Sequence, residues 1–375
     1  MWHANSRCRQ GGRRIRVAAS VSFAFLIFLC RDHLALEKES SLITHVTHVP
    51  MSWHDDHWFR FNQRMSSNTM PHAILLTGPA GVGKLQFARR LVAALMCSER
   101  APTGAACGQC RHCRLLENES HPDFVTVARE DNKKNISIDQ MRELAGYLQL
   151  SRDSIGYKVA LIPDADAMSV SAANSLLKNL EEPQPGRILL LMSDRPQALP
   201  ATIRSRCQRF EFAIPTREIA LLWLARHDAT RGDWELLLSL SHGAPLLALE
   251  LAQRGSMADR HEFFTAWLAL VRGQGDALKL ASQSLKQNAY GQLYWLYGWT
   301  VDLVRLKAAG TQAKIQNIDL GTELASLAAN LAWGDLYGGL DRCGAALASA
   351  QTTINVQLLM EDVLLSWDSR AGVAR

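Results

Sequence analysis

One short motif limits what this chain can fold into more than any other feature. Residues 78–84 read GPAGVGK, after a short apolar run at His72–Thr77 and before a helical pattern that begins near Phe87. A glycine-rich turn between a strand and a helix is the setting of a P-loop, in which backbone amides and the helix N-terminus surround phosphate groups. The lysine of such a loop reaches the terminal phosphates. The candidate nucleotide-binding residues are therefore Gly78, Gly81, Gly83 and Lys84.

Strands and helices alternate over the first half of the chain. Continuous apolar runs at Phe124–Val127, Lys158–Ile162 and Arg187–Met192 are typical of buried strands in a parallel sheet. Helical patterns separate them: one opens at Ser137 with a capping box, and another covers Ser169–Leu180. The alternation predicts an α/β P-loop domain with a doubly wound sheet.

The alternation ends near Phe212, and from Pro215 onward the sequence predicts helix after helix. We therefore divide the chain into an α/β P-loop domain at 51–212, a small helical domain at 213–255 and an all-α C-terminal domain at 256–375. A length of 375 residues suits two or three domains. The net charge of +5 permits contact with nucleic acid but does not argue for it.

The first fifty residues differ from the rest. Three arginines precede a 14-residue apolar run at Val17–Cys30, which is shorter than the span of about 20 residues that a bilayer requires. This order matches the start of a signal peptide, but no small-residue cleavage site follows it. Because ATP is cytosolic, we interpret residues 1–50 as a non-native or unstructured extension and expect translation to begin at Met51. We expect a cytoplasmic chain with no membrane contact.

The P-loop lacks its metal ligand. The residue after the lysine is normally Ser or Thr, whose hydroxyl binds Mg²⁺, but here it is Leu85. The acidic motif expected after Lys158–Ile162 has Pro163 where the metal-binding Asp belongs, followed by Asp164. Taking Asp164 as the metal ligand instead leaves Ala165 in place of the water-activating Glu. In either register the metal that neutralises phosphoryl charge is lost, so we expect little or no ATP hydrolysis by this chain.

Four cysteines lie close together in a C-x₉-C-x₂-C-x₂-C pattern. Four thiolates with two tight C-x₂-C steps are typical of a structural zinc site. His112, inside the second step, is a competing ligand. Disulfides and an iron–sulfur cluster are alternatives, although disulfides are disfavoured in the cytoplasm and nothing else indicates redox chemistry. The predicted zinc ligands, in a module at 97–113, are Cys97, Cys107, Cys110 and Cys113.

A short segment, TIRSRC at Thr202–Cys207, follows what we interpret as the last strand of the α/β domain. An arginine at a domain edge can enter a neighbour's ATP site and stabilise the transferring phosphoryl group, an effect of roughly 10³–10⁵ in rate. A surface arginine considered alone is usually only solvated. The order of this segment, after a P-loop and an acidic motif, favours the functional role.

Taken in order, these motifs resemble the AAA+ clamp-loader family, and within it the delta-prime subunits of bacterial DNA polymerase III. The matching segments run from Pro71 to Cys207 and are PHAILLTGPAGVGK, the four-cysteine insert, HPDF, AANSLLKNLEEP and IRSRC. The resemblance covers about residues 51–212. The helical remainder matches in length and character only.

The resemblance implies a RecA-like AAA+ module, a helical lid and a helical collar that holds a hetero-pentameric ring with gamma/tau and delta subunits. In that family the ring belongs to the DNA polymerase III holoenzyme, a DNA-directed DNA polymerase, and uses ATP to load the sliding clamp onto primed DNA. The resemblance implies a rigid stator that carries zinc and presents Arg206 as an arginine finger to ATP and Mg²⁺ in the neighbouring subunit. It also implies that Leu247 replaces the nucleotide-sensing arginine of the lid, while Ser193 falls at the polar sensor position.

Two other functions stay open from the sequence. One is a catalytically active gamma/tau-like ATPase with an unusual P-loop. The other is a zinc-dependent nucleic-acid-binding module, in which Arg111 and Arg114 of the cysteine insert contact the phosphate backbone. The losses at Leu85, Pro163 and Leu247 favour the stator over the ATPase.

Overall fold

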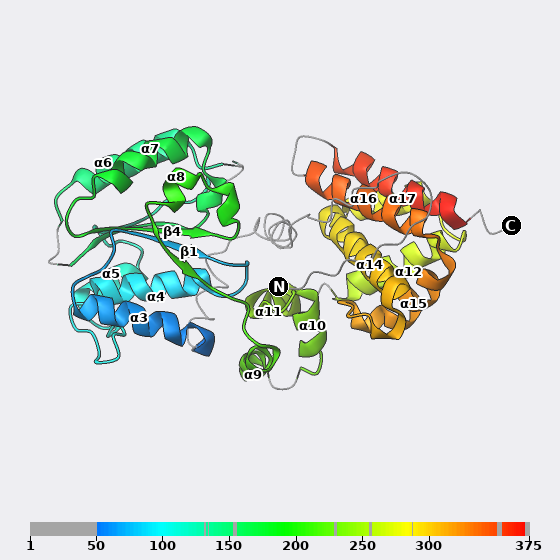
Figure 1. Ribbon diagram of the computed structural model, residues 1–375, viewed down its shortest axis with the longest axis horizontal. Coiled ribbons are helices and arrows are strands. Elements are labelled where there is room, and N and C mark those ends of the chain that lie inside the picture. The colour runs from blue at the N-terminus through cyan, green and yellow to red at the C-terminus, as the bar shows by residue number, and fades with distance from the viewer. Residues whose placement is uncertain are drawn as a thin grey trace, which may run out of the picture.

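Three groups of elements follow one another along the chain: an α/β group, a small group of three helices and a C-terminal helical group (Figure 1). The expected extension at 1–50 and the expected boundary at 255/256 lie outside the residues that the structure describes. The computed structural model describes residues 51–130, 133, 135–152, 156–228, 231–254, 257–286, 288–350 and 355–371.

The α/β group is built on five parallel strands in the order β2-β3-β4-β1-β5. Three of the apolar runs read from the sequence are confirmed as β2, β3 and β4, and the run before the P-loop as β1. Strands β1 and β3 are buried at every position, as a sheet covered on both faces requires. The strands are β1 (Ala73–Thr77), β2 (Phe124–Thr126), β3 (Lys158–Ile162), β4 (Arg187–Ser193) and β5 (Gln208–Glu211).

Helices cover both faces of this sheet (Figure 1). Ile74 and Leu76 of β1 pack on the side of α3 and α4, whereas Ala73 and Leu75 pack on the side of α6, α7 and α8. This division follows the two-residue period of a strand. The helices of the group are α3 (Asp55–Ser66), α4 (Lys84–Met96), α5 (Arg111–Glu117), α6 (Ile138–Gln149), α7 (Val170–Glu181) and α8 (Ala201–Arg204).

Local sequence signals fix the ends of two of these helices. The predicted capping box of α6 is confirmed, with the Ser137 side chain accepting from the Gln140 backbone amide and the Gln140 side chain accepting from the Ser137 amide. Helix α7 begins after Ser169, whose hydroxyl accepts from the Ala172 amide, and ends at Glu181, two residues before Pro183.

Several elements of the α/β group were not predicted, namely α3, α5, α8 and β5. The interpretation of 187–192 as the last strand is wrong, because β5 follows Arg206 and pairs with β1. Strand β5 is a short edge strand with only Phe210 buried, so it lacks the apolar run that marked the others. Helix α3 was also missed, although Phe61 and Met65 repeat at helical spacing on its buried face.

The second group is three helices around their own apolar cluster, which includes Trp223 and Trp234. Met51 and Trp53, from the start of the described chain, also pack into this cluster. The group therefore contacts the α/β group through the residues that precede α3. Its helices are α9 (Arg217–His227), α10 (Trp234–Leu240) and α11 (Pro245–Arg254).

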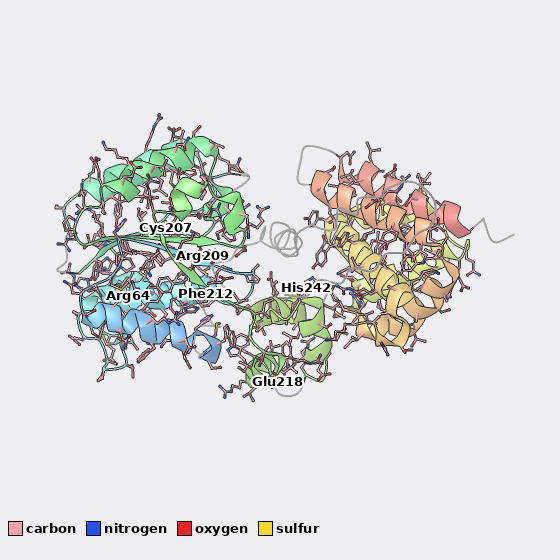
Figure 2. The ribbon with its side chains drawn as sticks, viewed as in Figure 1. Arg64, Cys207, Arg209, Phe212, Glu218 and His242 are labelled. Atoms are coloured by element: carbon pink, nitrogen blue, oxygen red, sulfur yellow. The ribbon has the colours of Figure 1, made fainter. Side chains whose placement is uncertain are left out.

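The C-terminal group is all helical and packs around three fully buried tryptophans, Trp267, Trp299 and Trp367. His242 lies on the side of the three-helix group that faces these helices (Figure 2). It hydrogen-bonds the Tyr294 hydroxyl at 2.9 Å. The helices are α12 (Met257–Val271), α13 (Ala277–Lys286), α14 (Ala289–Ala309), α15 (Gly321–Asn330), α16 (Trp333–Ser349) and α17 (Val356–Ala371). The domain boundaries proposed from the sequence stay predictions, although each group has its own apolar cluster.

Within the described ranges, no single helix has both the length and the apolar character needed to cross a bilayer. The pair Trp234–Leu240 and Pro245–Gln253 meets those criteria only when joined across a bend of 113°.

Candidate functional site

The P-loop leaves β1 at the carboxyl edge of the sheet and leads into α4. Gly78 adopts φ +141°, and a Cβ atom there would lie 2.1 Å from the Phe212 carbonyl oxygen, so only glycine fits. The Phe212 amide in turn donates to the Thr77 carbonyl at 2.7 Å. The predicted strand–loop–helix setting of the motif is therefore confirmed, and the loop is held against the chain that leaves β5.

The lysine of the loop is turned into the protein. Lys84 Nζ lies 2.6 Å from Asp194 Oδ1 and donates to the carbonyl oxygens of Gly78 at 2.8 Å and Pro79 at 2.6 Å. The two charged side chains are only 3% and 5% exposed. Asp194 reaches the lysine because β4 pairs with β1 in a register that places Ser193 opposite Thr77. The ammonium group of Lys84 is thus already hydrogen-bonded and ion-paired within its own chain.

Helix α11 begins directly on the P-loop. The Leu246 amide donates to the Gly81 carbonyl at 3.0 Å, and a Cβ atom on Gly81 would lie 2.4 Å from Leu247 Cγ. The structure thus places Leu247, the residue at the expected sensing-arginine position, against the loop. An apolar side chain there offers no donor to a phosphate.

The segment before α3 contacts the loop from another direction. Trp53 Nε1 donates to the Val82 carbonyl at 2.9 Å, and His54 Nε2 lies 2.8 Å from the same oxygen. Burial lowers the pKa of His54 to about 4, so the ring is neutral at pH 7 and Nε2–H is the donor. Leu85, in place of the Mg²⁺-binding hydroxyl, packs against the apolar cluster on the α3–α4 side.

The acidic residues near the loop are engaged with arginines. Strand β3 ends at Ile162, so Pro163 does occupy the next position, and Asp164 lies 3.6 Å from the Arg129 guanidinium. Asp166 lies 3.3 Å from the Arg195 guanidinium, and burial raises the pKa of this carboxyl group. These carboxylates face basic side chains of the same chain, which leaves no cluster of free oxygens for Mg²⁺ among the residues described here.

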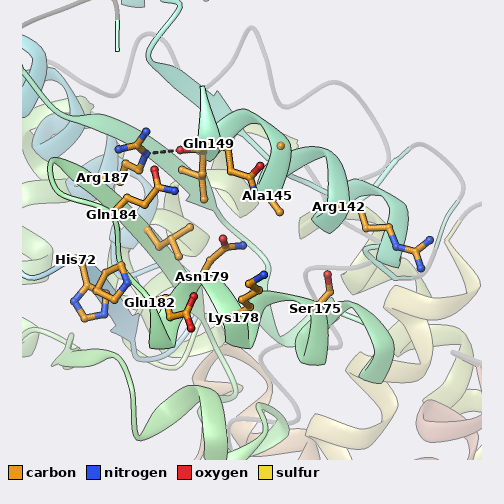
Figure 3. A pocket seen from close by; sticks show the side chains of 14 residues that line it. His72, Arg142, Ala145, Gln149, Ser175, Lys178, Asn179, Glu182, Gln184 and Arg187 are labelled. Atoms are coloured by element: carbon orange, nitrogen blue, oxygen red, sulfur yellow. Dashed lines mark hydrogen bonds between the residues drawn. The ribbon is translucent and has the colours of Figure 1, made fainter. Parts of the chain in front are cut away.

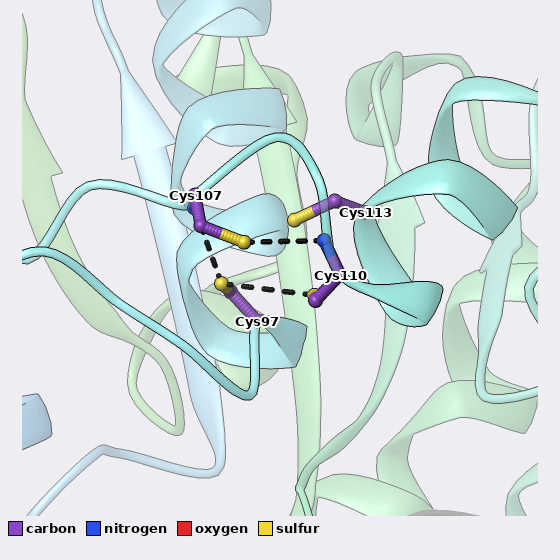
Figure 4. A group of neighbouring side chains, drawn as sticks. All are labelled: Cys97, Cys107, Cys110 and Cys113. Atoms are coloured by element: carbon purple, nitrogen blue, oxygen red, sulfur yellow. Dashed lines mark hydrogen bonds between the residues drawn. The ribbon is translucent and has the colours of Figure 1, made fainter.

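The four predicted cysteines do come together (Figure 4). Their Sγ atoms all lie within 4.8 Å of one another, and Cys97 Sγ is 4.0 Å from Cys110 Sγ. A tetrahedral zinc with Zn–S bonds of about 2.3 Å separates its sulfurs by about 3.8 Å. Backbone amides of Cys107 and Cys110 point at Sγ atoms of the cluster at 3.2 and 3.3 Å, as in thiolate knuckles. The cluster could therefore hold a metal ion, and no disulfide joins these cysteines.

The competing ligand His112 has another partner. Its Nδ1 atom lies 2.9 Å from His121 Nε2, and His121 Nδ1 accepts from the Asp123 amide at 3.1 Å. The second contact fixes the tautomer of His121, whose Nε2–H must then donate to His112. His112 thus connects α5 to the start of β2 and lies outside the four-sulfur group.

Arg206 lies far from the P-loop of its own chain. It precedes β5, whose first residue Gln208 is opposite Ile74, whereas the loop follows Thr77. At about 3.3 Å per residue, the four steps from Ile74 to Gly78 span about 13 Å, and Arg206 lies beyond Gln208 at the opposite end of the strands. The Arg206 side chain is 36% exposed, and its guanidinium lies 2.6 Å from a Glu181 carboxylate oxygen and donates to the Thr202 carbonyl at 3.0 Å.

One cavity of about 430 Å³ opens at the amino edge of the sheet, between the C-terminal halves of α6 and α7 (Figure 3). Its lining combines apolar and polar side chains, among them Lys178 and Asn179 of α7 and Glu182, which follows that helix. Arg187 is part of the lining, but its guanidinium donates to backbone carbonyls at the end of α6. No sequence pattern marks this cavity, because it forms only where two helix ends meet the sheet.

Sequence reasoning missed several residues that now define the P-loop site. Asp194, Trp53 and His54 were not singled out. Asp194 follows a buried strand at the same edge as the loop, but its contact with Lys84 depends on the strand order. The one available signal was that Asp194 is a polar residue just after an apolar run, where the carboxyl ends of parallel strands place ligand-binding groups.

A P-loop at the end of a central parallel strand, with a helical lid on that loop, defines this chain as an AAA+ protein with an additional all-α C-terminal part. The family described as DNA polymerase III, delta subunit, matches residues 53–216, and the family of its C terminal matches residues 254–369. DNA polymerase III subunit delta' of Pseudomonas aeruginosa is 36% identical over 310 residues, which cover 80% of this chain and 93% of that protein. The chain belongs to the family of DNA polymerase III delta-prime subunits.

Further proteins are similar to this chain over different shares of its length. DNA polymerase III subunit delta' of Escherichia coli is 34% identical over 298 residues, 78% of this chain and 88% of that protein. DNA polymerase III subunit tau of Bacillus subtilis is 31% identical over 229 residues, 60% of this chain but 37% of that protein. Among solved structures, a DNA polymerase III gamma subunit-related protein from Thermotoga maritima is 18% identical, covers 84% of this chain and 99% of its own, and has a TM-score of 0.42.

Proposed function

We propose that this chain is the stator of a DNA polymerase III clamp loader, which takes part in ATP-dependent loading of the sliding clamp without hydrolysing ATP itself. Its partners in this proposal are gamma/tau and delta subunits in a hetero-pentameric ring, together with the clamp and primed DNA. Because these partners act on chromosomal DNA, we place the chain in the cytoplasm.

The observation that carries the proposal is the internal pairing of Lys84. In a working P-loop the lysine approaches the terminal phosphates of ATP, but here its ammonium group contacts Asp194 and two carbonyls of the loop. For a nucleotide to bind, its phosphates would have to displace Asp194 from Lys84. The lysine would gain a phosphate as its new partner, but the buried Asp194 carboxylate would lose its lysine. Leu247 on Gly81 and the missing hydroxyl at Leu85 add to this obstacle.

The position of Arg206 supports a role in a neighbouring subunit. An arginine at the edge of the sheet opposite the P-loop cannot reach ATP bound in its own chain. Subunits that repeat head to tail bring one face of each subunit against a different face of the next, so the amino end of this sheet can adjoin the P-loop of a neighbour. We propose that Arg206 acts as an arginine finger toward ATP and Mg²⁺ bound by the adjacent gamma/tau subunit.

We propose structural zinc as the occupant of the four-cysteine cluster. Its ligands are Cys97, Cys107, Cys110 and Cys113. Four thiolates leave no open position for a substrate, which favours a structural role over a catalytic one. The metal would fasten the chain that joins α4 to α5.

Hydrolysis by the purified chain tests this function. We expect no ATP turnover above background for the chain alone, with or without clamp and primed DNA, and no saturable ATP binding at millimolar nucleotide. A purified gamma/tau subunit is the matched positive control. Turnover by this chain alone, stimulated by clamp and DNA, would instead establish the gamma/tau-like ATPase.

The same preparation tests the nucleic-acid-binding alternative. Tight, salt-sensitive binding of DNA by the isolated chain, weakened by R111A/R114A, would support that module. The stator proposal predicts weak DNA binding that these substitutions leave unchanged.

A further inference from the structure

The proposed finger is held by a second side chain of its own subunit. Arg206 NH2 lies 2.6 Å from Glu181 Oε1, and NH1 donates to the Thr202 carbonyl at 3.0 Å. We propose that Glu181 is a positioning residue, which orients the Arg206 guanidinium toward the adjoining subunit before ATP is hydrolysed there. This inference rests on the proposed role of Arg206.

The residues on both sides of Arg206 hold its backbone in place. The orientation of the Arg206 side chain is therefore what can still vary. Ile203 is fully buried in the cluster on the α6–α7 side, and Cys207 is 9% exposed in the same cluster. The Arg206 amide also donates to the Ile203 carbonyl at 3.1 Å. Two contacts to the guanidinium, from different elements, then fix its plane.

The place of Glu181 in its helix favours a role in pairing. Glu181 is the last residue of α7, where the partial negative charge of the helix end makes a carboxylate unfavourable. An adjacent arginine offsets that cost. The neighbouring Glu182 lines the cavity at the amino edge and makes no ion pair within the described part of the chain. Of the two glutamates, Glu181 is therefore the one that pairs with Arg206.

The pair leaves the arginine able to bind an anion. A guanidinium has five N–H donors, and the two observed contacts use only part of them. Both charged groups are partly exposed, at 36% and 49%, so solvent screens the pair. Such a pair contributes up to roughly a factor of five to an equilibrium. The ion pair should therefore act by orienting the Arg206 guanidinium, and its loss should lower the rate of hydrolysis only modestly.

The test uses the reconstituted clamp loader with E181A, E181Q and the matched control E182A, which removes the same charge one residue away. We expect E181A to lower the rate of single-turnover ATP hydrolysis at the adjoining gamma/tau site two- to fivefold without changing the affinity of that site for ATP. E181Q keeps an acceptor oxygen and should recover much of this loss, and E182A should match the wild type. In an R206A background, E181A should have no further effect.

The outcomes separate this inference from the proposed function. If R206A leaves turnover unchanged, the finger proposal fails and this one with it. If R206A lowers turnover but E181A does not, the finger stands and the positioning role of Glu181 is wrong. An equal loss from E181A in the R206A background, or faster turnover in E181A, also overturns it. Circular dichroism and ring assembly of each variant check that folding is retained.

Discussion

Lys84 Nζ and Asp194 Oδ1 lie 2.6 Å apart, and this ion pair connects the first residue of α4 to the residue that follows β4. The pair is nearly inaccessible to solvent. A lysine in a P-loop is usually kept for the phosphates of a nucleotide. Here the same residue joins the loop to the neighbouring strand, so the motif works as part of the scaffold.

Removing Asp194 should therefore destabilise the α/β group. D194A leaves a buried ammonium with carbonyl partners only, and we expect the free energy of unfolding to fall by about 3 kcal/mol. Urea denaturation followed by tryptophan fluorescence measures the change. The double variant K84A/D194A should lose less stability than the sum of the losses in the two single variants.

As a control, D139A removes an exposed partner of Arg142 and should lower the free energy of unfolding by less than about 1 kcal/mol. A loss in D194A no larger than the loss in D139A would contradict the structural role of the Lys84–Asp194 pair.

The four-cysteine cluster predicts one bound zinc per chain. C110S/C113S should abolish it and lower the melting temperature of the α/β group, because metal binding and folding are coupled. Elemental analysis of the purified protein measures the metal. C343A, in the core of the C-terminal group, is the control that should keep full zinc content. Iron with the absorbance of an iron–sulfur cluster, or a double variant that retains zinc, would refute the assignment.

Buried histidine predicts a loss of stability in acid. The pKa of His54 lies at about 4 in the folded chain, against about 6.5 for an unperturbed histidine, so the unfolded chain binds a proton first as the pH falls. The stabilising contribution is complete above pH 6.5 and is lost between pH 6.5 and about 4. At 1.36 kcal/mol per pKa unit it amounts to roughly 3 kcal/mol.

The variant H54Q tests this contribution. It can still donate to the Val82 carbonyl, but it does not titrate, so stability should depend less steeply on pH in this window. His242, whose pKa burial also lowers to about 4, remains in the variant and accounts for a residual slope. Denaturant midpoints at pH 4.5, 5.5 and 7 provide the comparison. An unchanged slope in H54Q would show that His54 is not the group responsible.

Much of the fold followed from local sequence signals. Strands β3 and β4 were marked by continuous apolar runs, and α6 by its capping box at Ser137. Strand β5 was missed because it buries only one residue, Phe210, and its other positions are exposed and polar or charged. The limit was therefore physical: a strand of this kind carries no continuous apolar run by which it could be told from a loop.

The candidate site could be predicted where its functional residues are close to one another in the sequence. The four cysteines lie within 17 residues, and their spacing was enough to bring them together. The partners of Lys84 and Arg206 were not foreseen, because Asp194 and Glu181 are distant in sequence and reach them only through strand order and helix packing. Long-range pairs of single charged residues leave no periodic trace in a sequence.

The most direct test of the stator account is hydrolysis by a clamp loader reconstituted with R206A in this chain. R204A, an exposed arginine two residues earlier, is the matched control. With R206A the ring should assemble and bind ATP normally, while single-turnover hydrolysis at the adjoining gamma/tau site falls by about 10³-fold or more. With R204A that site should turn over at the wild-type rate. Wild-type turnover at every site of the R206A assembly would contradict the account.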